Sequence, residues 1–303
     1  MCKTNTSHSK THIKKDHRKL KLLLPLLTTI PIVCYTYFSS FSDVANIYRG
    51  YPEILNQTLE EITESLSTSE LNNPTFLALI DEAITYPEAR VLLANHGAYP
   101  EILLELASSR PETLEFVVGY TTHQSSSTDD VISIKKDYTQ NSIPLFIQWD
   151  KRWGYASYGD EFIGSSGCGP TALSMVLVGL TGDTNMHPKA VADFSLKSGY
   201  FHSGLGTSWA LMSKGAQKLG LISKELPLNA NTITSTLQKG HPIILSMGPG
   251  HFTQSGHFIV LTGIASDGKI QVNDPGSIIN SQVTWDLDIL MSETKNLWAF
   301  SLA

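Results

Sequence analysis

Cys168 is the residue whose type and neighbours point most directly to chemistry. It is the only cysteine after residue 34, and it lies in the sequence Gly167-Cys168-Gly169-Pro170. The apolar spacing from Thr171 to Leu180 predicts a buried helix, which places the thiol in the first turn of that helix. Unpaired N–H groups and the helix dipole stabilise a thiolate there, and the thiolate is the nucleophilic form. The pattern favours a nucleophilic cysteine over a buried structural one.

A nucleophilic thiol needs a base, and His257 is the predicted base. It opens an apolar run, 257–264, which we expect to be a strand that turns through Ser266-Asp267-Gly268 into a second strand, 269–272. This hairpin returns Asp274 towards His257, and a register in which paired residue numbers have an odd sum puts both side chains on one face. The carboxylate then orients the imidazole, whose other nitrogen faces the sulfur.

Two neighbouring residues compete for these roles. His251 lies in Pro249-Gly250-His251-Phe252, which resembles the sequence around His257, but a loop rich in Gly and Pro holds a side chain less firmly than a strand does. An amide such as that of Asn273 also orients an imidazole, although its side chain is expected on the opposite strand face. His257 and Asp274 are the preferred pair, and His251 and Asn273 remain the alternatives.

The other histidines show no spacing typical of metal ligands, and one cysteine cannot build a structural zinc site. We therefore predict a site with no metal and no other cofactor.

Several short motifs in the C-terminal half occur in the order found in a known family. They are 143–153 (IPLFIQWDKRW), 167–175 (GCGPTALSM), 206–209 (GTSW), 240–244 (GHPII), 256–258 (GHF) and 273–275 (NDP). Over Ile143 to Ala303 the chain resembles the C39-like cysteine peptidases, which have a papain-like α+β fold, in their bacterial extracellular form. Each motif alone is weak, but their order is specific for the fold and not for a substrate.

The resemblance implies Cys168 as nucleophile, His257 as base and Asp274 as orienter. It also suggests that Gln148 supplies a side-chain donor to an oxyanion hole, beside the backbone N–H of Cys168. Here the sequence departs from the strict peptidase pattern, which has glutamine a few residues before the cysteine, whereas Phe162 stands six residues before Cys168. A loop must therefore bring Gln148 back to the site.

The N-terminus has the composition of an export segment. Seven Lys and Arg against one Asp give the first 21 residues a net charge of +6. Because the whole chain has a net charge of −6, residues 22–303 have a net charge of −12, which argues against nucleic acid as a partner. An apolar stretch, 22–38, follows and would span about 25 Å as a helix, which is marginal for a bilayer. Basic flank and apolar run predict export, either with the segment retained as a membrane anchor or with cleavage and secretion.

The region after the export segment repeats a phrase typical of helix starts. It occurs at 51–53 (YPE), 86–88 (YPE), 99–101 (YPE) and 110–112 (RPE). Proline at the first helical position and Glu in the first turn both favour a helix N-terminus, so we predict short helices joined by proline turns. Their role is either a spacer, which we prefer, or a pro-segment that covers the cleft.

The sequence thus predicts an α+β protein in four parts. Residues 1–45 are the basic N-terminus with an export segment or membrane anchor, 46–120 an α-helical spacer or pro-region, 121–141 a linker, and 142–303 the C39-like catalytic domain.

The expected function is that of a thiol hydrolase at a Gram-positive-type cell surface, which cleaves a peptide or amide bond through Cys168, His257 and Asp274. A cell-wall peptide amidase or a transpeptidase-like acyltransferase would use the same triad, and a binding module of the same fold would use none. The expected partners are a peptide or cell-wall peptide and, through the N-terminus, the membrane.

Overall fold

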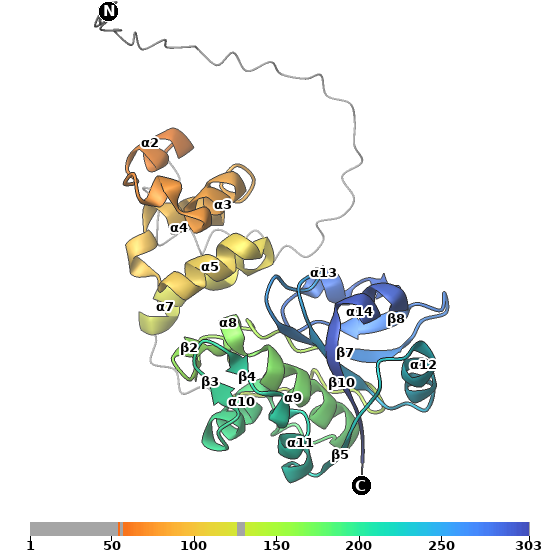
Figure 1. The fold of residues 1–303 in the computed structure, drawn as a ribbon. Coiled ribbons are helices and arrows are strands. Elements are labelled where there is room, and N and C mark those ends of the chain that lie inside the picture. Colours follow the sequence, from red (N-terminus) through yellow and green to blue (C-terminus); the bar gives the residue numbers. More distant parts are fainter. Residues whose placement is uncertain (1–53, 55–56, 126–130, 303) are drawn as a thin grey trace, which may run out of the picture. The chain divides into compact units, whose positions relative to one another are not determined.

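The computed structural model describes residues 54, 57–125 and 131–302 (Figure 1), and these belong to a single unit. The basic N-terminus and the apolar stretch 22–38 lie outside the described residues, so the export segment stays a prediction. Within the described ranges, no helix is long and apolar enough to span a membrane.

Short helices make up the region before the α+β domain. They are α2 (Leu59–Glu64), η2 (Glu70–Asn72), α3 (Pro74–Glu82), α4 (Pro87–Ala94), η3 (His96–Ala98), α5 (Glu101–Ser109), η4 (Pro111–Thr113), α6 (Leu114–Val118) and α7 (Tyr120–Ser125). Fully buried side chains such as Leu79, Leu92 and Leu103 pack them together. We refer to residues 59–125 as the helical region.

The repeated proline phrase marks helix starts, as predicted. Pro87 and Pro111 occupy the first positions of α4 and η4, and Pro100 immediately precedes α5. Proline fits there because its missing N–H is one that a helix start leaves without a partner. The first copy of the phrase, 51–53, lies outside the described residues.

The remaining elements form the α+β domain. They are β1 (Ser157–Tyr158), β2 (Glu161–Phe162), α8 (Ile163–Ser166), α9 (Cys168–Thr181), α10 (Pro188–Lys197), β3 (Phe201–His202), β4 (Gly206–Thr207), η5 (Trp209–Leu211), α11 (Lys214–Lys218), β5 (Leu221–Glu225), α12 (Ala230–Gln238), β6 (Ile243–Met247), β7 (His257–Ile264), β8 (Ile270–Asn273), α13 (Ile278–Ser281), β9 (Thr284–Trp285), α14 (Leu287–Glu293) and β10 (Thr294–Leu302).

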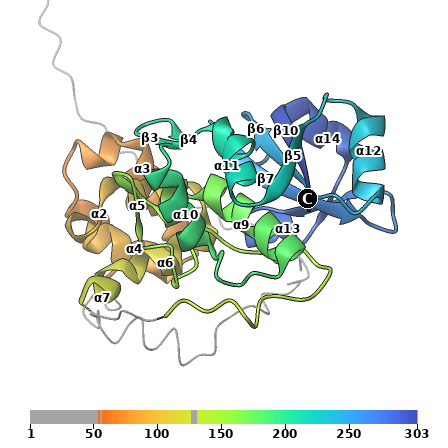
Figure 2. The same ribbon diagram turned by 90° about the horizontal axis from the view of Figure 1, so that it is seen from below.

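A six-stranded antiparallel sheet in the order β5-β10-β6-β7-β8-β9 separates two cores. On one face α9 packs against the sheet, with Val176, Val260 and Trp298 among the buried residues. On the other face α12 and α14 cover a second cluster that includes Ile259 and Leu290. Figures 1 and 2 show α9 on one side of the strands and α12 and α14 on the other. The helix that starts with Cys168 is thus fixed by a core along most of its length.

The predicted hairpin is present as β7 and β8. Its turn contains Gly268 at φ +83°, a conformation that favours glycine, and Asp267 accepts a hydrogen bond from the backbone N–H of Lys269 at 3.0 Å. The sequence Asp267-Gly268 therefore sets the turn, and the turn sets which residues of the two strands face each other.

The glycines around Cys168 allow close backbone contacts at the start of α9. A Cβ atom on Gly167 would lie 2.5 Å from the carbonyl oxygen of Ile163, and one on Gly169 would lie 2.6 Å from Cγ2 of Thr207 in β4. Both distances are shorter than real carbon contacts allow, so these positions need glycine for space. The start of α9 is thereby held between α8 and β4.

We expect Gly169→Ala to destabilise the protein by about 1–3 kcal/mol, the usual cost of overpacking a filled site. Urea denaturation of the wild type, Gly169→Ala, Thr207→Ala and the double variant measures this. Because Thr207→Ala removes two of the three atoms that the new methyl group would meet, Cγ2 and Oγ1, the double variant should cost less than the two single changes together. Additive costs would contradict the close contact.

Candidate active site

Three elements bring the predicted triad residues together. Cys168 is the first residue of α9, His257 is the first residue of β7, and Asp274 directly follows β8. Cys168 as a residue is partly exposed, whereas the exposed fractions of His257 and Asp274 are 7% and 0%. Cys168 therefore contacts solvent, while the side chains of His257 and Asp274 are shielded from water.

His257 links the thiol to the carboxylate. Its Nε2 lies 2.6 Å from Oδ1 of Asp274, and its ring interacts with the Cys168 side chain, whose pKa it lowers. Since Nε2 is occupied by the carboxylate, Nδ1 is the nitrogen left for the sulfur. The predicted nucleophile, base and orienting acid therefore lie in the order that the predicted chemistry needs.

Asp274 is held on all sides by hydrogen bonds. Oδ1 also accepts from the backbone N–H of Gly276 at 2.8 Å, and Oδ2 accepts from Nδ2 of Asn280 at 2.8 Å. The backbone N–H of Asp274 donates to Oγ of Ser281 at 2.8 Å. A buried carboxylate stays ionised only when such donors replace water, so this network keeps Asp274 charged.

The electrostatics of the three groups favour a thiolate and an imidazolium. Burial alone would raise the pKa of Cys168, but the hydrogen bond and charge of His257, with the backbone N–H groups of Phe258 and Gly169, bring this pKa below its ordinary value. Burial alone would lower the pKa of His257, but the charge and hydrogen bond of Asp274, with those of Cys168, raise it to about 9.

The pKa of Asp274 lies below its usual value. Burial alone would raise it, and this is outweighed by the charge and hydrogen bond of His257, the hydrogen bond of Asn280 and the positive charge of Arg110. The carboxylate therefore remains the counter-charge of His257 throughout the neutral range.

An irregularity in the hairpin places His257 and Asp274 on one face. Near the turn, Ile264 pairs with Ile270 and Gly263 with Gln271, and this register, continued, would put the two side chains on opposite faces. The register shifts by one residue between Leu261 and Gly263, after which Val260 pairs with Asn273. The shift, a bulge at Thr262, gives the odd register that the triad requires.

The model of the Peptidase_C39 like family matches residues 140–300. The chain belongs to this family. Membership implies a cysteine-type peptidase, and it confirms the family that the sequence motifs predicted for the C-terminal half.

One solved structure similar to this C39-like chain is the crystal structure of the peptidase domain of Streptococcus ComA, a bi-functional ABC transporter involved in a quorum sensing pathway. It is 18% identical, covers 46% of this chain and 93% of that domain, and has a TM-score of 0.34. No curated protein matches the chain.

The two alternative residues have other partners in the C39-like domain. His251 is exposed, and its Nδ1 forms a short contact with Oε1 of Glu293. Nδ2 of Asn273 donates to the carbonyl oxygens of Ile143 and Pro144 at 3.2 and 3.0 Å, on the opposite strand face from His257, as predicted. The geometry therefore favours His257 and Asp274 over His251 and Asn273.

Gln148 is brought back to the site by the loop between residues 131 and 156. Its exposed fraction is 5%, and its backbone N–H donates to the carbonyl of Pro275 at 2.7 Å. Its Nε2 donates to the carbonyls of Gly164 and Ser165 at 2.8 and 3.3 Å, ahead of Cys168. Donation to an oxyanion requires the exchange of one of these hydrogen bonds, so that role stays a prediction.

Sequence reasoning missed the residues that support Asp274. Asn280 lies six residues after Asp274 with no motif around it, and Arg110 lies in the helical region, where only its proline phrase stood out. Gly276 also went unnoticed, although a Cβ there would lie 3.1 Å from Cε1 of His257. Among the described residues, no group of three His, Cys, Asp or Glu side chains is placed to hold a metal ion.

We expect Asp274→Ala to lower the free energy of unfolding by about 3–5 kcal/mol at pH 6–7, because it leaves a buried imidazole and two donors without their partner. Chemical denaturation of Asp274→Ala, His257→Ala and the double variant measures this. The double variant should cost less than the two single changes together, since each single change already breaks the pair. If the costs simply add, the pair is not the interaction that stabilises this site.

Proposed function

We propose that this C39-like protein is a thiol hydrolase that cleaves a peptide or amide bond with Cys168, His257 and Asp274. The observation that carries the proposal is the placement of His257, whose ring lies beside the Cys168 side chain and, through Nε2, bonds the buried carboxylate of Asp274. An imidazole in this position is a proton donor at neutral pH, and a thiolate beside it is an attacking group.

The proposed reaction has two stages. The thiolate of Cys168 attacks the carbonyl carbon, and the C–N bond breaks as His257 gives its proton to the leaving amine, which leaves an acyl group on the sulfur. His257, now neutral, then takes a proton from a water molecule whose oxygen attacks the acyl carbon, and the thiolate is released with the acid. Asp274 keeps the imidazole oriented through both stages.

Backbone N–H groups at the start of α9 are the proposed donors to the oxyanion. The N–H of Cys168 lies at a helix N-terminus, where the first turn leaves N–H groups without intrahelical partners. Gln148 is the proposed side-chain donor, supported by its hydrogen bond to the carbonyl of Gly164 in α8, the short helix before Cys168.

We also propose that the protein acts outside the cell, tethered by residues 1–45 or released after cleavage. The support is the basic flank with +6 in the first 21 residues, followed by the apolar stretch 22–38. A cell-surface location makes cell-wall peptides available as substrates besides proteins. An amidase or a transpeptidase-like acyltransferase would use the same acyl-sulfur intermediate, since the amidase differs only in the amide it cleaves and the acyltransferase only in the group that accepts the acyl.

Purified cell wall and a mixed peptide library, each incubated with the full chain, distinguish these activities. Soluble muropeptides indicate an amidase, cleaved library peptides a peptidase, and new amide products with an added amine a transpeptidase. Cys168→Ala should abolish whichever activity is found, and His251→Ala should leave it largely intact. Full activity in Cys168→Ala, or loss in His251→Ala alone, would overturn the assignment.

The pH dependence of turnover should be bell-shaped. The acid limb follows ionisation of Cys168, whose pKa is below its ordinary value, and activity needs pH above it. The alkaline limb should lie near pH 9, since the leaving amine needs the proton that His257 loses there. Measurement of kcat/KM from pH 4 to 11 tests this, and an alkaline limb near pH 6.5 would contradict the strong pairing of His257 with Asp274.

A further inference from the structure

The helical region contacts the loop that carries Asp274. Glu112, in η4, accepts a hydrogen bond from Oγ of Ser277 at Oε1 (2.5 Å). Its Oε2 accepts from the backbone N–H groups of Ile278 and Ile279 at 2.8 and 3.1 Å. One carboxylate from outside the C39-like domain thus binds three donors at the start of α13.

The helix α13, which Glu112 contacts at its start, also forms hydrogen bonds with Asp274. Asn280, in α13, donates to Oδ2 of Asp274, and Ser281 accepts the backbone N–H of Asp274. The hydroxyl of Ser281 also reaches the carbonyl of Ser277 at 2.8 Å, so both ends of α13 are joined. Glu112 therefore fixes an element whose remaining polar groups orient the carboxylate partner of His257.

Arg110 lies on the same surface, two residues before Glu112. Its Nη2 donates to the carbonyl of Phe252 at 2.7 Å, in the loop that leads to His257. A Cβ atom on Gly276 would lie 3.0 Å from Nη1 of Arg110 and 3.1 Å from Cε1 of His257, so the guanidinium and the imidazole pack against the same stretch of backbone. Arg110 thus joins the loop before His257 to the loop after Asp274.

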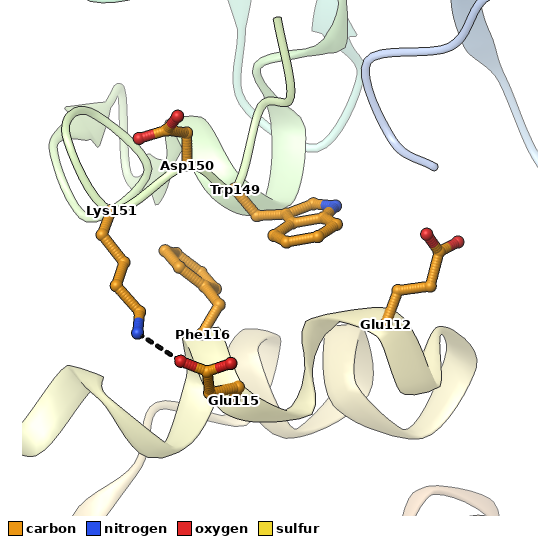
Figure 3. A pocket seen from close by; sticks show the side chains of 6 residues that line it. All are labelled: Glu112, Glu115, Phe116, Trp149, Asp150 and Lys151. Carbon is orange, nitrogen blue, oxygen red and sulfur yellow. Dashed lines mark hydrogen bonds and ion pairs between the residues drawn. The ribbon is translucent and has the colours of Figure 1, made fainter. Parts of the chain in front are cut away.

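Other contacts between the helical region and the C39-like domain do not involve α13. Lys151 pairs with Glu115 at 2.6 Å, and the hydroxyl of Tyr155 donates to the carbonyl of Phe116 at 2.6 Å. Figure 3 shows Glu115 and Phe116 facing residues 149–151 across a pocket of about 230 Å³, with Glu112 beyond Trp149. The Glu115–Lys151 pair therefore provides an internal control, because it joins the same two parts without touching α13.

We propose that Arg110 and Glu112 are positioning residues for the His257–Asp274 pair, so that the helical region completes the active site instead of acting as a spacer or a removable pro-segment. This inference rests on the proposed function of the triad. It reverses our preference from the sequence, where proline-capped helices pointed to a spacer.

The positioning effect of Glu112 can be separated from the effect of its charge, because the two predict opposite shifts in the pKa of Cys168. Loss of a nearby negative charge stabilises a thiolate and would lower the pKa of Cys168, whereas loss of the orientation of His257 would raise it. Glu112→Ala removes both the charge and the contacts. Glu112→Gln removes the same charge but keeps an oxygen for the two N–H groups, and Ser277 can turn to accept from the new amide.

The experiment follows alkylation of Cys168 against pH in the full chain. Iodoacetamide labelling is read at the Cys168 peptide by mass spectrometry, because Cys2 and Cys34 also carry thiols. Each variant is labelled well below its own melting temperature. We expect Glu112→Ala to move the midpoint upward by about one pH unit or more, towards the ordinary thiol value of about 8.5, and Glu112→Gln to leave it nearly unchanged.

Three further variants serve as controls. Glu115→Ala removes a charge and a contact at the same interface and should not move the midpoint. Arg110→Lys keeps the positive charge, but the lysine side chain cannot contact both Phe252 and Gly276. This variant should therefore raise the midpoint of Cys168 alkylation. If Glu112→Ala does not fold, Glu112→Asp replaces it. The shorter aspartate keeps the negative charge but cannot reach the donors at the start of α13, so this variant should also raise the midpoint.

An unchanged or lower midpoint in the Glu112→Ala or Glu112→Asp variant, with a low midpoint in the wild type, overturns this inference and leaves the proposed function standing. A wild-type midpoint already near 8.5 overturns both. A fall in melting temperature with no change in midpoint shows a purely structural contact and also overturns the inference.

Discussion

The hydrogen bond between Nε2 of His257 and Oδ1 of Asp274 is the interaction on which the active site depends. The two side chains are shielded from water, so each buried charge is stable only because the opposite charge lies beside it. The carboxylate is supported by donors from Gly276 and Asn280, and the imidazole turns its remaining nitrogen to the thiol. The loop after β8 and the helix α13 thus keep this pair together.

The proton shared by Cys168 and His257 also has a consequence for stability. In an unfolded chain between about pH 6.5 and 8.5, the thiol holds a proton and the imidazole does not. In the folded chain the lowered thiol pKa and the raised imidazole pKa both favour transfer of that proton to His257. Transfer of one proton from the sulfur to the imidazole leaves the number of bound protons unchanged, so the transfer itself adds no pH dependence to folding.

The sequence predicted the elements of the site because each leaves a local pattern. Glycines before an apolar run marked the start of α9, and Asp267-Gly268 between apolar strands marked the hairpin. The bulge at Thr262 left no pattern, because threonine is ordinary in a strand, yet it decides which face Asp274 occupies. The contact between Glu112 and Ser277 joins residues 165 positions apart, and no single sequence shows such a pair.

The proline phrase at 110–112 illustrates the same limit. Its proline starts η4, as predicted, but its arginine and glutamate are used for contacts with the loops around His257 and Asp274 and not for the helix itself. The other described copies begin helices within the helical region. Similar local patterns can therefore have different roles, and the tertiary contacts show which role each one has.

The most direct test of this account is the pH dependence of alkylation at Cys168 in the full chain, with His257→Ala beside the wild type. A thiolate stabilised by an imidazolium predicts fast labelling at pH 5–6 in the wild type, and a midpoint that returns to about 8.5 in the variant. Labelling that begins only near pH 8.5 in both proteins would contradict the thiolate–imidazolium pair and, with it, the assignment of this site.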